Sequence, residues 1–109
     1  MKPPEQFERI INGKRYSVAS AELIAGDDFW DGRNFERRGR QCFLYKTANG
    51  AFFIVTLTQW QGERDTLTPV TEAEAVAMYE GRPNEHGVDL SEHRVTYENA
   101  FPDIEITEA

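Results

Sequence analysis

The feature that most constrains this chain is the pair Asn49-Gly50, which separates two runs of aromatic and β-branched residues. The runs are Cys42-Phe43-Leu44-Tyr45 and Phe52-Phe53-Ile54-Val55-Thr56-Leu57. Asn and Gly both tolerate positive φ, so the chain can reverse there, and this arrangement is the strongest local signal for a β-hairpin. The sequence therefore predicts an antiparallel hairpin over residues 41–59.

Two turn geometries are compatible with this hairpin. A two-residue turn pairs Leu44 with Val55, whereas a type I turn with Gly50 as a bulge residue pairs Tyr45 with Phe53. The second geometry is favoured because it gives the more apolar face. The opposite face also carries apolar side chains, so either the chain covers both faces or one face is offered to a partner.

Two short helices are predicted, one before the hairpin in the sequence and one after it. The first spans Val18–Ala25 and ends at Gly26. The second begins after Thr71, whose side chain forms a capping box with Glu74, and it ends at Gly81. Both helices are short, so their stability has to come from packing rather than from helix propensity.

Shorter extended segments complete the expected fold, which is α+β: an antiparallel sheet built on the central hairpin, with the two helices packed against it. Phe7–Ile11 is predicted as a strand that returns through the turn Asn12-Gly13. Leu67–Val70 is extended because the residue before a proline avoids the helical region. Arg94–Tyr97 is predicted as a late strand.

The length of 109 residues predicts one domain. Residues 1–6 are expected to be a loose leader, 7–101 the domain and 102–109 an acidic tail. Residues 1–6 lack the apolar segment of a signal peptide, so a cytoplasmic location is expected. The single cysteine, Cys42, has no partner for an internal disulfide and is interpreted as a small buried hydrophobe on a strand.

Charge is unevenly distributed along the chain. The net charge is +1 over residues 1–40, +1 over 41–60 and −9 over 61–109, which gives the total of −7. An acidic segment repels nucleic acid and membrane phosphate and attracts basic protein surfaces. Solubility alone would also explain this charge.

Four segments together resemble a family of small, uncharacterised bacterial proteins found on phages and plasmids. The segments are Gly13-Lys14-Arg15-Tyr16, Ala21-Glu22-Leu23-Ile24-Ala25, Leu44-Tyr45-Lys46-Thr47-Ala48-Asn49-Gly50-Ala51-Phe52-Phe53 and Pro69-Val70-Thr71-Glu72-Ala73-Glu74-Ala75. The family pattern is a Gly-Lys-x-Tyr start, a short helix, a Leu-Tyr-Lys/Arg-Thr-x-x-Gly hairpin and a Pro-Leu-Thr-x-x-Glu-Ala helix. The resemblance covers roughly residues 12–80 and departs at Met78, where the family tends to have Trp.

This resemblance implies a setting rather than an activity, because its motifs are turns, caps and core positions. The implied setting is that of accessory proteins of mobile elements, some of which bind host proteins. Small acidic inhibitors of host defence, such as anti-CRISPR proteins, belong to this setting.

Neither a metal site nor a catalytic site is predicted. A metal needs several converging ligands, and Gly87 argues against one continuous helix that would align the candidates His86, His93, Glu85, Asp89 and Glu92. The carboxylates Asp27, Asp28 and Asp31 could serve acid–base chemistry only in a desolvated cleft. The sequence contains no Gly-x-Ser-x-Gly motif, phosphate loop or dinucleotide fingerprint, so no enzyme activity and no cofactor are expected.

The function predicted first is a non-catalytic protein-binding module, including an inhibitor of a host protein encoded by a mobile element. Aromatic side chains would anchor a partner, and acidic groups would steer a basic one, in the manner of a DNA mimic where the partner binds nucleic acid. The candidate partner-binding residues are Phe29, Trp30, Asp31, Trp60, Glu63 and Asp65.

Two alternatives remain open. The first is a single-stranded nucleic-acid binder, in which arginines contact phosphates and an aromatic ring stacks on a base; its residues are Arg33, Arg37, Arg38, Arg40 and Tyr45. The second is a homodimeric domain that hides the second apolar face of the hairpin in its interface.

Overall fold

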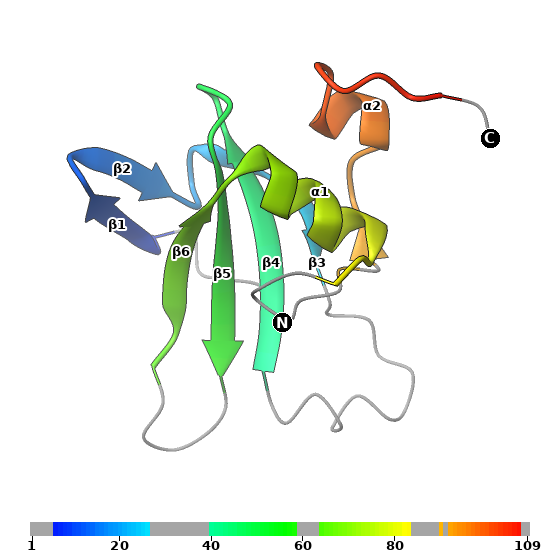
Figure 1. Cartoon of the computed structure of the whole chain (residues 1–109). Coiled ribbons are helices and arrows are strands. Elements are labelled where there is room, and N and C mark those ends of the chain that lie inside the picture. Colours follow the sequence, from blue (N-terminus) through cyan, green and yellow to red (C-terminus); the bar gives the residue numbers. More distant parts are fainter. Residues whose placement is uncertain (1–5, 27–39, 59–63, 84–89, 91, 108–109) are drawn as a thin grey trace.

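The structure, a computed structural model, describes residues 6–26, 40–58, 64–83, 90 and 92–107. Its main sheet is antiparallel and contains, in spatial order, β6 (Thr66–Val70), β5 (Phe52–Thr58), β4 (Arg40–Thr47), β3 (Ala21–Gly26) and β7 (Glu92–His93). A separate two-stranded sheet consists of β1 (Glu8–Ile11) and β2 (Lys14–Ser17), and the helices are α1 (Glu72–Glu80) and α2 (Tyr97–Ala100). The fold is therefore α+β, with minor helices (Figure 1).

Strands β4 and β5 pair in the register that the sequence favoured, with Tyr45 opposite Phe53. The amide of Gly50 donates to the carbonyl oxygen of Thr47 at 2.9 Å, and the amide of Thr47 donates to the carbonyl oxygen of Ala51 at 2.8 Å. Gly50 has φ 86°, a conformation that glycine adopts without a Cβ clash. The turn is thus closed by a bulge at Gly50 rather than by a two-residue loop.

Side chains on the two faces of β4 and β5 enter two different cores, because successive residues of a strand point to opposite faces. On one face, Leu44, Phe52 and Ile54 pack against α1, α2 and Leu90. On the other face, the buried side chains are Phe43, Tyr45, Phe53, Val55 and Leu57, packed against Tyr16 and Val18. The chain therefore covers both apolar faces of the hairpin.

The β1–β2 hairpin supplies the cover for the second face. It reverses at Asn12 and Gly13, which have φ 54° and φ 77°, as the sequence predicted. Tyr16 is 8% exposed, and its ring meets that of Phe53 edge to face at 5.7 Å between centroids. The Arg9 side chain donates to the carbonyl oxygen of Leu67 in β6, at 3.4 Å.

Helix α1 is capped as predicted. Thr71 Oγ1 accepts from the Glu74 amide at 3.1 Å, and the Glu74 carboxylate accepts from the Thr71 amide at 2.9 Å. At the other end, Gly81 has φ 75°, and the Arg82 amide donates to the carbonyl oxygen of Ala77. Figure 1 shows α1 lying across the sheet, where the buried residues are Ala75, Val76, Ala77, Met78 and Tyr79.

The prediction of a helix over Val18–Ala25 was wrong, because residues 21–26 form β3. Pairing with β4 satisfies the backbone of this short apolar segment, and a bulge at Ile24 directs its carbonyl oxygen to the amides of Arg94 and Val95. An isolated eight-residue helix has too little intrinsic stability to compete with these contacts. Gly26 is not a helix cap: a Cβ there would lie 3.0 Å from Cδ1 of the buried Phe43.

The prediction of a late strand over Arg94–Tyr97 was also wrong. The strand β7 ends at His93, and Thr96 is the N-cap of α2, with its Oγ1 accepting from the Asn99 amide at 3.4 Å. Beyond α2, the amide of Ile104 donates to the carbonyl oxygen of Phe101 at 3.1 Å, and Ile104 is partly buried against the helical core. Part of the predicted acidic tail therefore packs on the domain.

Candidate functional site

Most of the sequence-predicted partner-binding and nucleic-acid-binding residues lie outside the described part of the chain. These residues are Phe29, Trp30, Asp31, Arg33, Arg37, Arg38, Trp60 and Glu63. The same holds for the carboxylates Asp27 and Asp28 and for the metal candidates Glu85, His86 and Asp89.

Three predicted site residues can be placed. Asp65 is exposed, and its Oδ1 accepts from the Thr58 amide at 2.9 Å, so its carboxylate connects the ends of β5 and β6. Arg40 is the first residue of β4. Tyr45 is 5% exposed and stacks on Phe53 with 5.3 Å between ring centroids, so its ring faces the core rather than a base.

His93 belongs to an aromatic cluster between α1, β7 and α2. Its ring stacks on Tyr79 with 3.8 Å between centroids and an interplanar angle of 9°. His93 Nε2 lies 2.9 Å from the carbonyl oxygen of Tyr79, and because a carbonyl only accepts, we assign the proton to Nε2. The His93 N–H therefore lies at the C-terminal end of α1, where the helix dipole favours a hydrogen-bond donor. Helix α1 has no basic residue of its own in its last turn.

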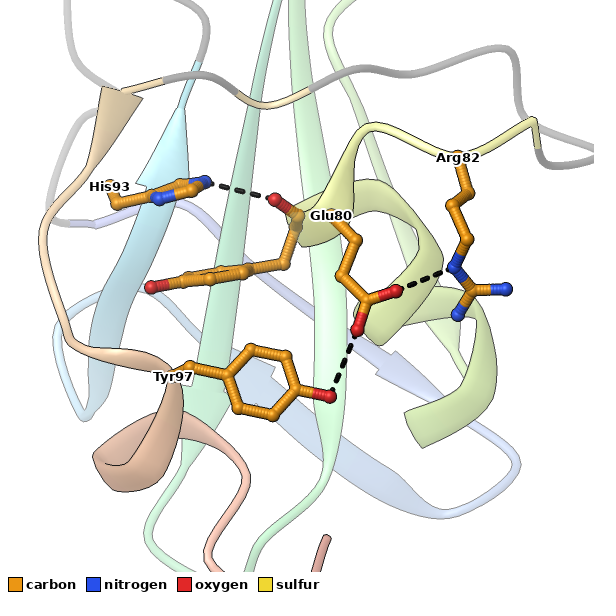
Figure 2. Close-up of polar contacts among 5 residues, drawn as sticks. Glu80, Arg82, His93 and Tyr97 are labelled. Carbon is orange, nitrogen blue, oxygen red and sulfur yellow. Dashed lines mark hydrogen bonds and ion pairs between the residues drawn. The ribbon is translucent and has the colours of Figure 1, made fainter. Parts of the chain in front are cut away.

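The hydroxyl groups of Tyr79 and Tyr97 connect this aromatic cluster to polar groups through hydrogen bonds. The Tyr79 hydroxyl donates to the carbonyl oxygen of Val95 at 2.7 Å. The Tyr97 hydroxyl donates to Glu80 Oε2 at 3.0 Å, while Glu80 Oε1 accepts from Arg82 Nε at 2.6 Å. Figure 2 shows the Glu80 carboxylate between the Tyr97 hydroxyl and the Arg82 guanidinium.

Burial and neighbouring carboxylates raise the pKa of both phenols. Burial raises the pKa of Tyr97 above its usual value of 10.0, and the hydrogen bond to Glu80 raises it further. Burial also raises the pKa of Tyr79, with a second contribution from the negative charge of Glu98. Both phenols are protonated at neutral pH, as tyrosines with an ordinary pKa also are, and their hydroxyls donate to the Val95 carbonyl oxygen and to Glu80.

The raised pKa values predict a loss of stability at alkaline pH. A group whose pKa is higher in the folded state stabilises the fold fully below its unfolded pKa and loses that contribution as pH rises through the folded pKa. Urea unfolding should therefore show stability falling above about pH 10. Tyr97→Phe should make this decline shallower, and an equally steep decline in that variant would contradict the prediction.

A pocket of about 410 Å³ adjoins Tyr97. Its lining residues are Glu80, Tyr97, Glu105, Ile106 and Thr107. A second pocket, of about 440 Å³, lies between residues 19–22 and the end of β4 at Lys46, Thr47 and Ala48. The Lys46 ammonium donates to the carbonyl oxygen of Ala100 at 3.0 Å, so it holds α2 against the sheet.

Charge differs between the two sides of the sheet. On the side of α1, α2 and residues 101–107, which we call the acidic layer, the carboxylates are Glu72, Glu74, Glu80, Glu98, Asp103 and Glu105. The basic residues on this side are Arg82 and Arg94 in the flanking turns and Lys46, whose ammonium contacts α2, so carboxylates are in excess there. On the opposite side, the β1–β2 hairpin exposes Arg9, Lys14 and Arg15 together with Glu8.

The sequence did not indicate that Tyr79, His93 and Tyr97 would meet. Tyr97 was expected at the end of a strand, and His93 was considered only as a metal candidate. The only local signal was Thr96, which can cap a helix over Tyr97–Ala100. Stacking of His93 on Tyr79 depends on the pairing of β7 with β3, which no local pattern encodes.

Comparisons with known protein families, curated proteins and solved structures return no match to this chain. Among the residues that the structure describes, no three His, Cys, Asp or Glu side chains are grouped to hold a metal ion. None of the helices in this part of the chain is long and apolar enough to cross a membrane.

Proposed function

We propose that this protein is a non-catalytic protein-binding module whose acidic layer receives a basic partner. The observation that carries this proposal is the separation of charge across the sheet, with carboxylates concentrated over α1, α2 and residues 101–107. A surface with an excess of one charge attracts a partner of the opposite charge over about 10 Å at moderate salt and raises its association rate.

Two features support a binding role for this side of the molecule, an exposed apolar side chain and an ordered pair of polar groups. Ile106 is 53% exposed among these carboxylates, so apolar contact area is available beside the charges. The Tyr97 hydroxyl and the Glu80 carboxylate are held in place by hydrogen bonding, and groups that are already ordered lose little conformational entropy on binding.

These observations favour protein binding over the two alternatives. The buried ring of Tyr45 is not available to stack on a base, and the acidic layer repels phosphate. The second apolar face of β4 and β5 is covered by the β1–β2 hairpin, so a homodimer is not needed to hide it.

Within this proposal, the partner is a host protein and the chain is an inhibitor encoded by a mobile element, with anti-CRISPR proteins as one such group. The resemblance over residues 12–80 supports this setting, and the net charge of −7 supports a partner that itself binds nucleic acid. In that case the acidic layer would compete with the nucleic acid for a basic groove. The predicted location remains cytoplasmic.

The test is affinity capture with a charge-reversed variant. Tagged protein should retain a stoichiometric protein partner from a bacterial lysate, and Glu98→Lys combined with Asp103→Lys should lose it. The control, Glu8→Lys, reverses a carboxylate on the β1–β2 hairpin, outside the acidic layer, and should retain the partner. Capture of no stoichiometric protein, or equal capture by the double variant and the control, would refute the proposal.

A further inference from the structure

We infer that the pocket beside Tyr97 receives an arginine side chain of a protein partner. This inference rests on the proposed protein-binding function and names the chemical group that the site recognises. The pocket combines two carboxylates, a phenol ring and an exposed aliphatic side chain within about 410 Å³. The pocket is largely open to solvent, so it can admit a side chain from the surface of a partner.

One wall already binds a guanidinium group. Glu80 Oε1 accepts from Arg82 Nε at 2.6 Å, while Oε2 accepts from Tyr97. The Arg82 side chain is 57% exposed, so its ion pair with Glu80 is open to competition from another guanidinium. Exposed ion pairs of this kind contribute only about 0–1 kcal/mol, so their exchange has a small cost.

The other wall offers a second carboxylate. Glu105 is exposed, and within the residues that the structure describes no hydrogen bond or ion pair engages it. A cation entering the pocket would therefore meet one carboxylate that is paired and one that is not. A planar guanidinium can address both with separate N–H groups, which a single ammonium does less well.

The apolar lining fits the stem of the same side chain. Ile106 is 53% exposed and Tyr97 is partly buried, so both present carbon surface next to the carboxylates. The methylene groups of arginine pack on such surface while the charged end reaches polar groups. Guanidinium also stacks on aromatic rings, which favours arginine over lysine here.

The test is a titration of the full chain, followed by NMR, with Nα-acetyl-arginine amide as the probe. Binding in about the millimolar range is expected for a ligand of this size, with shifts centred on Tyr97, Glu105 and Ile106. The citrulline analogue has nearly the same shape without the charge and should cause no comparable shifts. Equal shifts with citrulline, or none with arginine, would overturn the inference.

Three variants locate the binding. Glu105→Gln should weaken the arginine titration about two- to fivefold, and Arg82→Ala should strengthen it by a similar factor because it removes the competing guanidinium. Glu22→Gln, which makes the same charge change in the other pocket, should leave it unchanged. Equal weakening by Glu105→Gln and Glu22→Gln would refute the assignment of this pocket.

The two proposals can fail separately. If arginine does not bind at Tyr97 but partner capture still depends on Glu98 and Asp103, only the pocket assignment is wrong. If arginine binds there but no protein is captured, the protein-binding function is wrong. The NMR spectrum of each variant reports whether it remains folded, so unfolding cannot be mistaken for loss of binding.

Discussion

Replacing Phe101 with alanine is expected to lower the free energy of unfolding by about 3–5 kcal/mol. Phe101 is fully buried, and its ring lies 5.4 Å from that of Phe52, 5.5 Å from Tyr79 and 5.3 Å from Tyr97, between centroids. Removing it leaves a cavity where α2, α1 and the sheet meet. A domain of this size has a total stability of about 5–15 kcal/mol, so the loss would be a large fraction of it.

Urea unfolding, with the slope compared between variants, measures this effect. The matched control is Ile106→Ala, because Ile106 is 53% exposed and lies only five positions along the chain. The control should change stability by no more than about 0.5 kcal/mol. A loss below about 1 kcal/mol in Phe101→Ala would mean that residues 97–107 do not form part of the cooperative domain.

The hairpin could be predicted in detail because its determinants are local. The positive φ required at Gly50 and the pairing of Tyr45 with Phe53 both follow from a few adjacent residues. The same is true of α1, whose capping box and C-terminal glycine are defined by residues within a single helix. Such elements need no knowledge of the rest of the fold.

Residues 18–25 show where local reasoning failed. Leu23, Ile24 and Ala25 form a short apolar run, which fits a buried helix segment and a buried strand equally well. What decides the outcome is β4, whose backbone pairs with this run across the bulge at Ile24. The requirement for glycine at position 26 likewise comes from Phe43, far away in the sequence.

The candidate site could not be predicted for the same reason. Tyr79 and His93 are 14 residues apart, and Tyr97 and Glu80 are 17 apart, so each contact depends on how β7 and α2 return to α1. Only the negative charge of the segment after residue 60 was visible in advance. The sequence thus indicated that the site would be negatively charged, but it did not indicate where the site would lie.

Removing the β1–β2 hairpin, by deleting residues 1–17, is expected to make the protein self-associate. The deletion would expose the face of β4 and β5 on which Phe43, Phe53 and Val55 are each fully buried. Exposed apolar patches larger than a few hundred Å² are typical of interaction surfaces and of aggregation-prone variants. Tyr16→Ala, a milder change to the same contact, should lower stability by about 3 kcal/mol.

Light scattering after size-exclusion chromatography, with the full chain run at the same concentrations, measures the association. The deletion variant should form assemblies whose molar mass in solution exceeds that of the full chain. It should also bind a hydrophobic dye, because the face of β4 and β5 that the β1–β2 hairpin covers would be exposed. The control, Lys14→Ala combined with Arg15→Ala, removes positive charge from the hairpin without uncovering the sheet, so its mass should match that of the full chain. A deletion variant that stays folded, with the mass of one chain and no dye binding, would show that β1–β2 does not protect this face.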